Sequence, residues 1–177
     1  METSLHQNHF DLLGLPQRFS IDLPQLEQGY RHLQSRVHPD RHAASDAAAR
    51  LHSLQLATQA NEAYRTLKQP VSRARYLLSL NGVDTAEETN TAMPGDFLMM
   101  QMEWRESIEE ARHAQDVAAL ESVAKRLRNE LRSIEGMLLE ALDVQHNHLR
   151  AAETVRKCRF MERLMDDINT AMDTLLD

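Results

Sequence analysis

The chain of 177 residues is long enough for one large domain or two small ones, and its 5 glycines and 5 prolines among many Leu, Ala, Glu, Gln, Arg and Met residues predict an all-α fold. No run of about 18 apolar residues could cross a membrane, and residues 1–9 lack a signal-peptide pattern, so we expect a soluble cytoplasmic protein. The formal net charge of −7 and the lack of a large basic cluster argue against nucleic-acid binding.

The first expected elements are a short helix near His9 to Leu13 and a longer helix that begins at Pro24. Asp22 can cap the longer helix, and Gln25 stands at the reciprocal position of a capping box. Pro39 ends this helix, because the residue before a proline is disfavoured in the α conformation. The apolar face is predicted by steps of three and four at Leu23, Leu26, Tyr30, Leu33 and Val37.

A second long helix is expected after a loop from His38 to Ala44. Ser45 can serve as its N-cap, and the helix stops before Pro70. Because a short loop joins the two helices, they should pack antiparallel, with a further short helix from Val71 to Leu80 beside them. The apolar stripe of the second helix is expected at Ala47, Leu51, Leu54, Ala57, Tyr64 and Leu67.

A break in the helical pattern divides the chain. Asn81-Gly82 ends the regularity, and the polar, threonine-rich stretch up to Pro94-Gly95 is typical of a linker. We therefore predict an N-terminal domain at residues 1–80, a linker at 81–95 and a C-terminal domain at 96–177. The first 80 residues hold 9 Lys and Arg against 7 Asp and Glu, a net charge of +2, whereas the rest holds 11 against 20, a net charge of −9. This difference suggests different partners for the two domains.

The C-terminal domain is predicted to be a three-helix bundle, with helices at Asp96 to His113, Asp116 to about Gln145, and about Asn147 to Leu176. The seam of the middle helix is expected at Val117, Leu120, Ala124, Leu127, Leu131, Ile134, Leu138 and Leu142. The last helix carries its stripe at Met161, Leu164, Ile168, Met172 and Leu175. Three amphipathic helices of this kind can close one core.

The first bundle helix is predicted to have apolar side chains on two faces. At about 100° per residue the core face contains Phe97, Met100, Trp104, Ile108 and Ala111. On the opposite side, where a solvated helix should be polar, lie Leu98, Met99 and Met102 beside Glu103 and Glu106. This pattern favours a protein-binding patch. The alternative is that the linker or another helix covers these side chains.

The tripeptide His38-Pro39-Asp40 lies in the loop of the expected helical hairpin. With QANEAYRTL at 59–67 and PVSRARY at 70–76, it resembles the J domain of DnaJ-type co-chaperones over roughly residues 9–80. The resemblance implies docking to a DnaK-type chaperone and stimulation of its ATPase. The chaperone-binding residues would be Tyr30, Arg31, Arg36, His38, Pro39, Asp40 and Arg41. Glu27 is acidic where the family commonly has a basic residue, which would weaken electrostatic steering. The alternative is a helix-breaking turn with Asp40 as a cap.

A second resemblance covers nearly the whole chain. YLLSLNG at 76–82, Phe97-Leu98-Met99, Trp104-Arg105-Glu106 and VRKCRF at 155–160 are similar to the HscB family of iron–sulfur cluster co-chaperones, bacterial type. This resemblance implies two partners, the chaperone HscA and the cluster scaffold IscU. The implied scaffold-binding residues are Leu98, Met99, Met102, Glu103, Glu106 and Phe160. Met102 and Trp104 replace leucines expected in the family, and the eukaryotic members' N-terminal cysteine metal site is missing.

Catalysis and bound cofactors are not expected, because the chain shows neither a nucleophile constellation nor a glycine-rich phosphate loop. His38 and His42 have the spacing of a helical zinc pair, but Pro39 interrupts such a helix and no third ligand is evident. The single cysteine, Cys158, excludes an intramolecular disulfide and lies in the apolar pattern of the last helix, so we expect a packed residue. Solvent exposure is expected for His6, His9, His146 and His148.

Two other functions stay open as alternatives. A general J-domain protein that delivers unfolded clients would share the first domain, but zinc-finger cysteines and a glycine-rich linker are missing. A histidine-based metalloenzyme would require stoichiometric metal in the purified protein.

Overall fold

The computed structural model describes residues 7–37, 47–87 and 93–176. The expected loop at His38 to Ala44 and the expected cap Ser45 lie outside these residues. The chain divides into two compact units, Met1–Leu80 and Asn81–Asp177. Every regular element in the described ranges is helical, so the all-α prediction is confirmed. None of the described helices is both long enough and apolar enough to cross a membrane.

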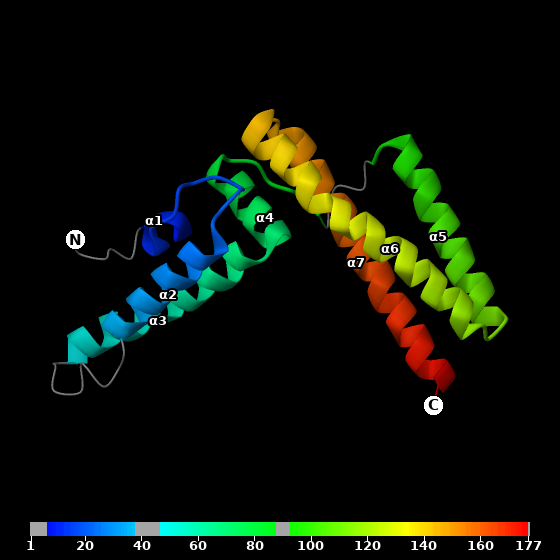
Figure 1. Cartoon of the computed structure of the whole chain (residues 1–177), viewed down its shortest axis with the longest axis horizontal. Coiled ribbons are helices and arrows are strands. Elements are labelled where there is room, and N and C mark those ends of the chain that lie inside the picture. Colours follow the sequence, from blue (N-terminus) through cyan, green and yellow to red (C-terminus); the bar gives the residue numbers. More distant parts are fainter. Residues whose placement is uncertain (1–6, 38–46, 88–92, 177) are drawn as a thin grey trace. The chain divides into compact units, whose positions relative to one another are not determined.

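The first unit consists of α1 (His9–Leu13), α2 (Leu23–Val37), α3 (Ala47–Lys68) and α4 (Pro70–Leu80), with α2 packed along α3 (Figure 1). Helix α1 packs across this pair and α4 packs on α3. The largest fully buried side chains of the unit are Phe10, Phe19, Leu26, Leu67 and Leu78. A single core therefore joins all four helices.

Local caps place α1 and α2 against each other. The Oδ1 atom of Asp22 accepts a hydrogen bond of 3.1 Å from the Gln25 amide, so the predicted N-cap is confirmed. The Gln25 side-chain amide donates a hydrogen bond to the Gly14 carbonyl oxygen at 3.2 Å. Gly14 ends α1 in the left-handed conformation, with a φ of 70°. Gln25 thus links the end of α1 to the start of α2.

The predicted apolar stripe of α3 is partly wrong. Leu51 and Leu54 are 57% and 61% exposed, and the buried positions are Ser53, Leu56, Ala60, Ala63 and Leu67. The Ser53 hydroxyl donates to the Val37 carbonyl oxygen at 2.7 Å, which satisfies the last turn of α2. Small side chains on this face let α2 and α3 approach closely. Leu23, at the start of α2, is also exposed rather than buried.

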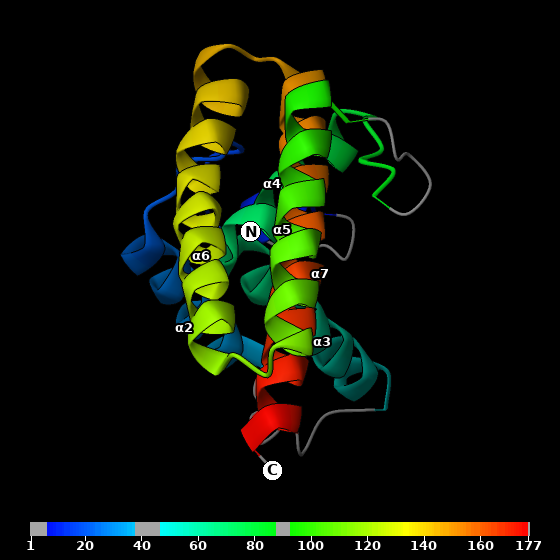
Figure 2. The same ribbon diagram turned by 90° about the vertical axis from the view of Figure 1, so that its right-hand side faces the viewer.

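The second unit is a bundle of α5 (Gly95–His113), α6 (Val117–Leu139) and α7 (His148–Leu176), whose helices are seen from the side in Figure 2. Helix α6 packs along both α5 and α7. The predicted seam of α6 is buried at Leu120, Ala124, Leu127, Ile134, Leu138 and Leu142, and half-buried at Val117 and Leu131. The three-helix bundle is therefore confirmed.

The middle helix does not run to Gln145 as one α-helix. The α-helix ends at Leu139, and a single π-helical turn, η2 (Glu140–Val144), follows. In this wider turn the Gln145 amide donates to the Glu140 carbonyl oxygen, five residues back, at 2.9 Å. Both Ala141 and Leu142 are buried there, so the wider turn keeps consecutive apolar residues in the core.

Candidate protein-binding surfaces

Helix α5 has one face in the bundle core. Phe97, Trp104, Ile108 and Ala111 are buried, whereas Met100 is half-buried. Trp104 is only 6% exposed, and its ring meets the Phe97 ring edge-on with centroids 6.2 Å apart. Edge-on aromatic pairs add stabilisation beyond the buried area. The core face of this helix is therefore filled by its own bundle.

The opposite face of α5 carries an exposed apolar patch. Leu98, Met99 and Met102 are 43%, 66% and 72% exposed, and Glu103 and Glu106 beside them are exposed as well. The described residues of the bundle leave these side chains exposed, and residues 88–92 of the linker, which the alternative would place over them, lie outside the described residues. Exposed methionines with acidic neighbours suit a surface that binds another protein through adaptable apolar contacts.

Phe160 on α7 borders this patch. Its half-buried ring meets Phe97 edge-on at a centroid distance of 5.8 Å, and the Arg105 guanidinium lies over the ring at 5.2 Å. Arg105 follows Met102 by three residues on α5, so it lies on the same helix face. Arg105 thus links the patch on α5 to Phe160. We name Leu98, Met99, Met102, Glu103, Glu106 and Phe160 the bundle patch.

Two cations beside the aromatic pair were not predicted from the sequence. Arg105 covers Phe160, and the Lys157 ammonium lies 5.3 Å from the centroid of Phe97 while it pairs with Glu153 at 2.9 Å. The spacing of Arg105 from Met102 could have placed Arg105 on the face of the patch. Both cation contacts join α5 to α7, which are distant in sequence, so no local pattern reveals them.

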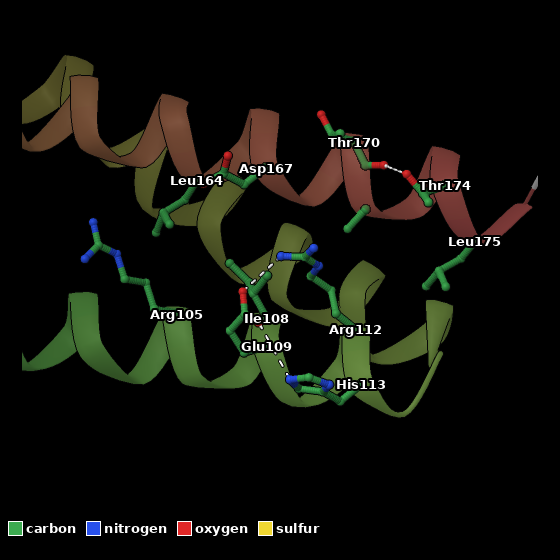
Figure 3. Close-up of a pocket in the computed structure, with 11 residues that line it drawn as sticks. Arg105, Ile108, Glu109, Arg112, His113, Leu164, Asp167, Thr170, Thr174 and Leu175 are labelled. Carbon is green, nitrogen blue, oxygen red and sulfur yellow. Dashed lines mark hydrogen bonds and ion pairs between the residues drawn. The ribbon is translucent and has the colours of Figure 1, made fainter.

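A groove of about 800 Å³ lies between the C-terminal halves of α5 and α7 (Figure 3). Ion pairs form among the charged residues on the α5 side of the groove, where Glu109 pairs with Arg112 at 3.0 Å and lies 4.0 Å from His113. These pairs are exposed, and such pairs contribute little stability. The groove adjoins the bundle patch through Arg105, and its remaining lining residues are Ile108, Leu164, Asp167, Thr170, Ala171, Thr174 and Leu175.

In the first unit, the residues expected to contact a chaperone differ in their exposure and in their contacts within the domain. Arg31 and Arg36 are exposed on α2, and Arg31 pairs with Glu27 at 3.3 Å, which reduces its availability for steering. Tyr30 is half-buried, and its ring stacks on Tyr64 at a centroid distance of 4.3 Å. The Tyr30 hydroxyl also donates to Asn61 Oδ1 at 2.7 Å, so this residue ties α2 to α3. His38, Pro39, Asp40 and Arg41 lie outside the described residues.

Known proteins resemble the whole chain. A family model described as the HSCB C-terminal oligomerisation domain matches residues 93–169. A co-chaperone protein HscB homolog from Chromobacterium violaceum is 53% identical over 177 residues, which covers 100% of both chains. The chain belongs to the HscB co-chaperone family. A homolog of the same name from Azoarcus sp. is 47% identical over 175 residues, 99% of each chain.

Solved HscB structures have the same fold. The chaperone HscB from Vibrio cholerae is 37% identical, with a TM-score of 0.78 and coverage of 96% of this chain and 99% of the other. The human co-chaperone protein HscB is 28% identical, with a TM-score of 0.84 and coverage of 94% and 83%. The HscB fold here is a J domain followed by a C-terminal three-helix bundle. The predicted fold class is therefore confirmed.

In the part of this HscB-family chain that the structure describes, no group of three or more His, Cys, Asp or Glu residues could hold a metal ion. Cys158 is buried, and its thiol faces Glu162 at 3.8 Å, as expected for a packed residue. The predicted exposure is confirmed for His146 and wrong for His9 and His148, which are half-buried, and the His9 ring stacks on Tyr76 with centroids 4.1 Å apart. This burial lowers the pKa of His9, although the Glu62 carboxylate opposes the shift.

Proposed function

We propose that this chain is a co-chaperone of iron–sulfur cluster assembly that binds a scaffold protein of the IscU type through the bundle patch. In the same proposal, its J domain docks on a DnaK-type chaperone of the HscA type and stimulates the partner's ATPase. The observation that carries the proposal is the exposure of Leu98, Met99 and Met102 on a helix whose core face is already filled. Membership of the HscB family supports the choice of partners.

The chemistry of the bundle patch fits a protein partner. Apolar side chains that are exposed before binding gain roughly 25 cal/mol for each Å² that a partner removes from water. Glu103 and Glu106 lie beside the apolar side chains and would select a partner with basic groups at the rim of its complementary surface. Phe160 already packs edge-on with Phe97, which limits the side-chain entropy lost on binding.

The J domain would supply the second contact. Pro39 restricts the backbone next to His38 and Asp40, so these side chains can be presented at a low entropic cost. The exposed Arg31 and Arg36 would attract an acidic surface of the chaperone. Under this proposal the chain needs no catalytic group and no cofactor, because the partner hydrolyses the ATP.

Joining the two surfaces in one chain gives the mechanism. A scaffold on the bundle and a chaperone on the J domain would be held near each other, and the second encounter would become intramolecular. The effective concentration of each partner for the other would then exceed its concentration in solution. The chaperone's ATP cycle would drive release of the cluster from the scaffold, with the cluster as cargo rather than as a cofactor of this chain.

Calorimetric titration with a purified IscU-type scaffold tests the bundle patch. Changing Leu98, Met102 and Phe160 together to Ala should weaken binding at least about tenfold, since this needs only about 1.4 kcal/mol. The matched control changes three exposed apolar residues elsewhere in the bundle, Met137, Leu139 and Leu149, to Ala. The control should bind like the wild type. Equal scaffold affinity of all three proteins, with intact melting curves, would exclude the bundle patch as the binding site.

A further inference from the structure

The segment expected to be a linker is anchored to the bundle at one residue. Thr85 is only 6% exposed, although it lies in a polar stretch after the last helix of the first unit. Its carbonyl oxygen accepts a hydrogen bond of 3.1 Å from Arg156 Nη1 on α7, a residue 71 positions later in the chain. Both groups belong to the second unit. This contact therefore holds the start of the linker on α7.

The backbone around Thr85 adopts a defined turn. Ala86 has a φ of 49°, in the left-handed region that non-glycine residues rarely adopt. The Ala86 amide donates to Asp84 Oδ1 at 2.9 Å, and the Thr85 hydroxyl donates to Glu87 Oε1 at 2.7 Å. Such a conformation costs on the order of 1–2 kcal/mol and persists only where surrounding contacts fix it. Arg156 supplies a contact of this kind.

Arg156 also lies close to the proposed scaffold site along α7. Phe160 follows it by four residues, so the two side chains share one face of the helix. Lys157, the next residue, lies over the ring of Phe97, which in turn packs against Phe160. The anchored segment therefore meets α7 one helical turn from the bundle patch.

The anchor changes the length of free chain between the two units. Helix α4 ends at Leu80 and α5 begins at Gly95, so an unanchored connection would comprise residues 81–94. With Thr85 held on α7, only residues 81–84 connect the units. A shorter connection raises the effective concentration of each bound partner for the other.

We propose that Arg156 is a positioning residue that anchors the interdomain segment on α7 and so shortens the connection between the J domain and the bundle patch. The anchor itself is independent of any partner. Its consequence rests on the proposed function, because a shorter connection raises the effective concentration of a bound scaffold for a bound chaperone. Arg156 touches neither partner in this proposal.

Hydrogen exchange tests the anchor without any partner. The variant Arg156→Met keeps an apolar stem but removes the donor group, whereas Arg156→Lys keeps a charge and a donor group. Arg163→Met, at an exposed position of the same helix, is the matched control. Exchange of the Ala86 amide should be at least about tenfold faster in Arg156→Met, because a hydrogen bond to a charged group contributes about 1.5–3 kcal/mol. Arg156→Lys should lie between the wild type and Arg156→Met, and Arg163→Met should match the wild type.

An ATPase assay tests the consequence. With subsaturating protein, the scaffold-dependent part of chaperone stimulation should be lower in Arg156→Met than in the wild type, whereas stimulation without scaffold and affinity for the scaffold should be unchanged. Unchanged exchange of the Ala86 amide would overturn the anchor. Faster exchange with unchanged scaffold-dependent stimulation would overturn its role in assembly. A wild-type chain that does not bind the scaffold would refute the proposed function instead, and exchange would still decide the anchor.

Discussion

Replacing Gly29 by Ala should destabilise the J domain, although the same change in most helices is stabilising. Gly29 lies inside α2, where Ala is favoured over Gly by about 1 kcal/mol. A Cβ atom at this position would overlap the Leu13 carbonyl oxygen and lie 3.1 Å from the Leu13 carbonyl carbon. Because both are backbone atoms, α1 must move away from α2. Overpacking of this kind costs about 1–3 kcal/mol, and a rigid backbone neighbour places the cost near the upper end. The net loss should be about 1–2 kcal/mol.

The matched control is Gly136→Ala in α6, where an added Cβ would meet no atom within 4 Å. This change should stabilise the bundle by up to about 1 kcal/mol. Each kcal/mol corresponds to roughly 4–8 °C in the melting temperature of a domain of this size. Gly29→Ala should therefore lower the first unit's melting temperature by about 4–16 °C, while Gly136→Ala raises that of the second.

Intrinsic chromophores separate the two units in this assay. The single tryptophan, Trp104, lies in the second unit, so its emission follows the bundle. Near-ultraviolet dichroism of the tyrosines follows the first unit, which contains Tyr30, Tyr64 and Tyr76. If Gly29→Ala raised the melting temperature of the first unit as Gly136→Ala should raise that of the second, the close approach of α1 and α2 would be refuted.

Two further predictions concern stability. Trp104→Ala should destabilise the bundle by about 3–5 kcal/mol in urea unfolding, whereas Met102→Ala on the exposed face should change it by no more than about 0.5 kcal/mol; equal effects would contradict the two-faced α5. Burial lowers the pKa of His9, so the unfolded chain takes up a proton more readily and stability should fall as the pH drops below about 6.5. His9→Gln should reduce this fall in pH-dependent unfolding, and an unchanged slope would exclude His9 as its source.

The periodicity of apolar residues correctly predicted the helices whose buried faces consist of large side chains. The seam of α6 and the core face of α5 repeat at three and four residues with Leu, Ile, Phe or Trp, so their buried faces followed from the sequence. The exposure of Leu98, Met99 and Met102 followed in the same way, because α5 has only one bundle to pack against. Their role in binding stays a prediction.

Other features could not follow from local pattern. On α3 Leu51 and Leu54 lie outward, whereas Ser53, Ala60 and Ala63 lie inward because small residues let α2 approach. Hydrophobicity alone ranks these positions wrongly. The anchoring of Thr85 depends on Arg156, 71 residues away. A contact at such a separation has no periodic signature, so the segment could be predicted only as a linker.

In the proposed mechanism, one chain holds the scaffold and the chaperone at the same time. The direct test measures scaffold-enhanced ATPase activity of the chaperone with two variants, His38→Gln and the Leu98, Met102 and Phe160 triple alanine variant, each defective in one surface. At concentrations below those that saturate either partner, each variant alone should lose the enhancement. An equal mixture of the two should not restore it, because neither chain joins both partners. Full restoration by the mixture would contradict the account, since the two surfaces would then work without a covalent connection.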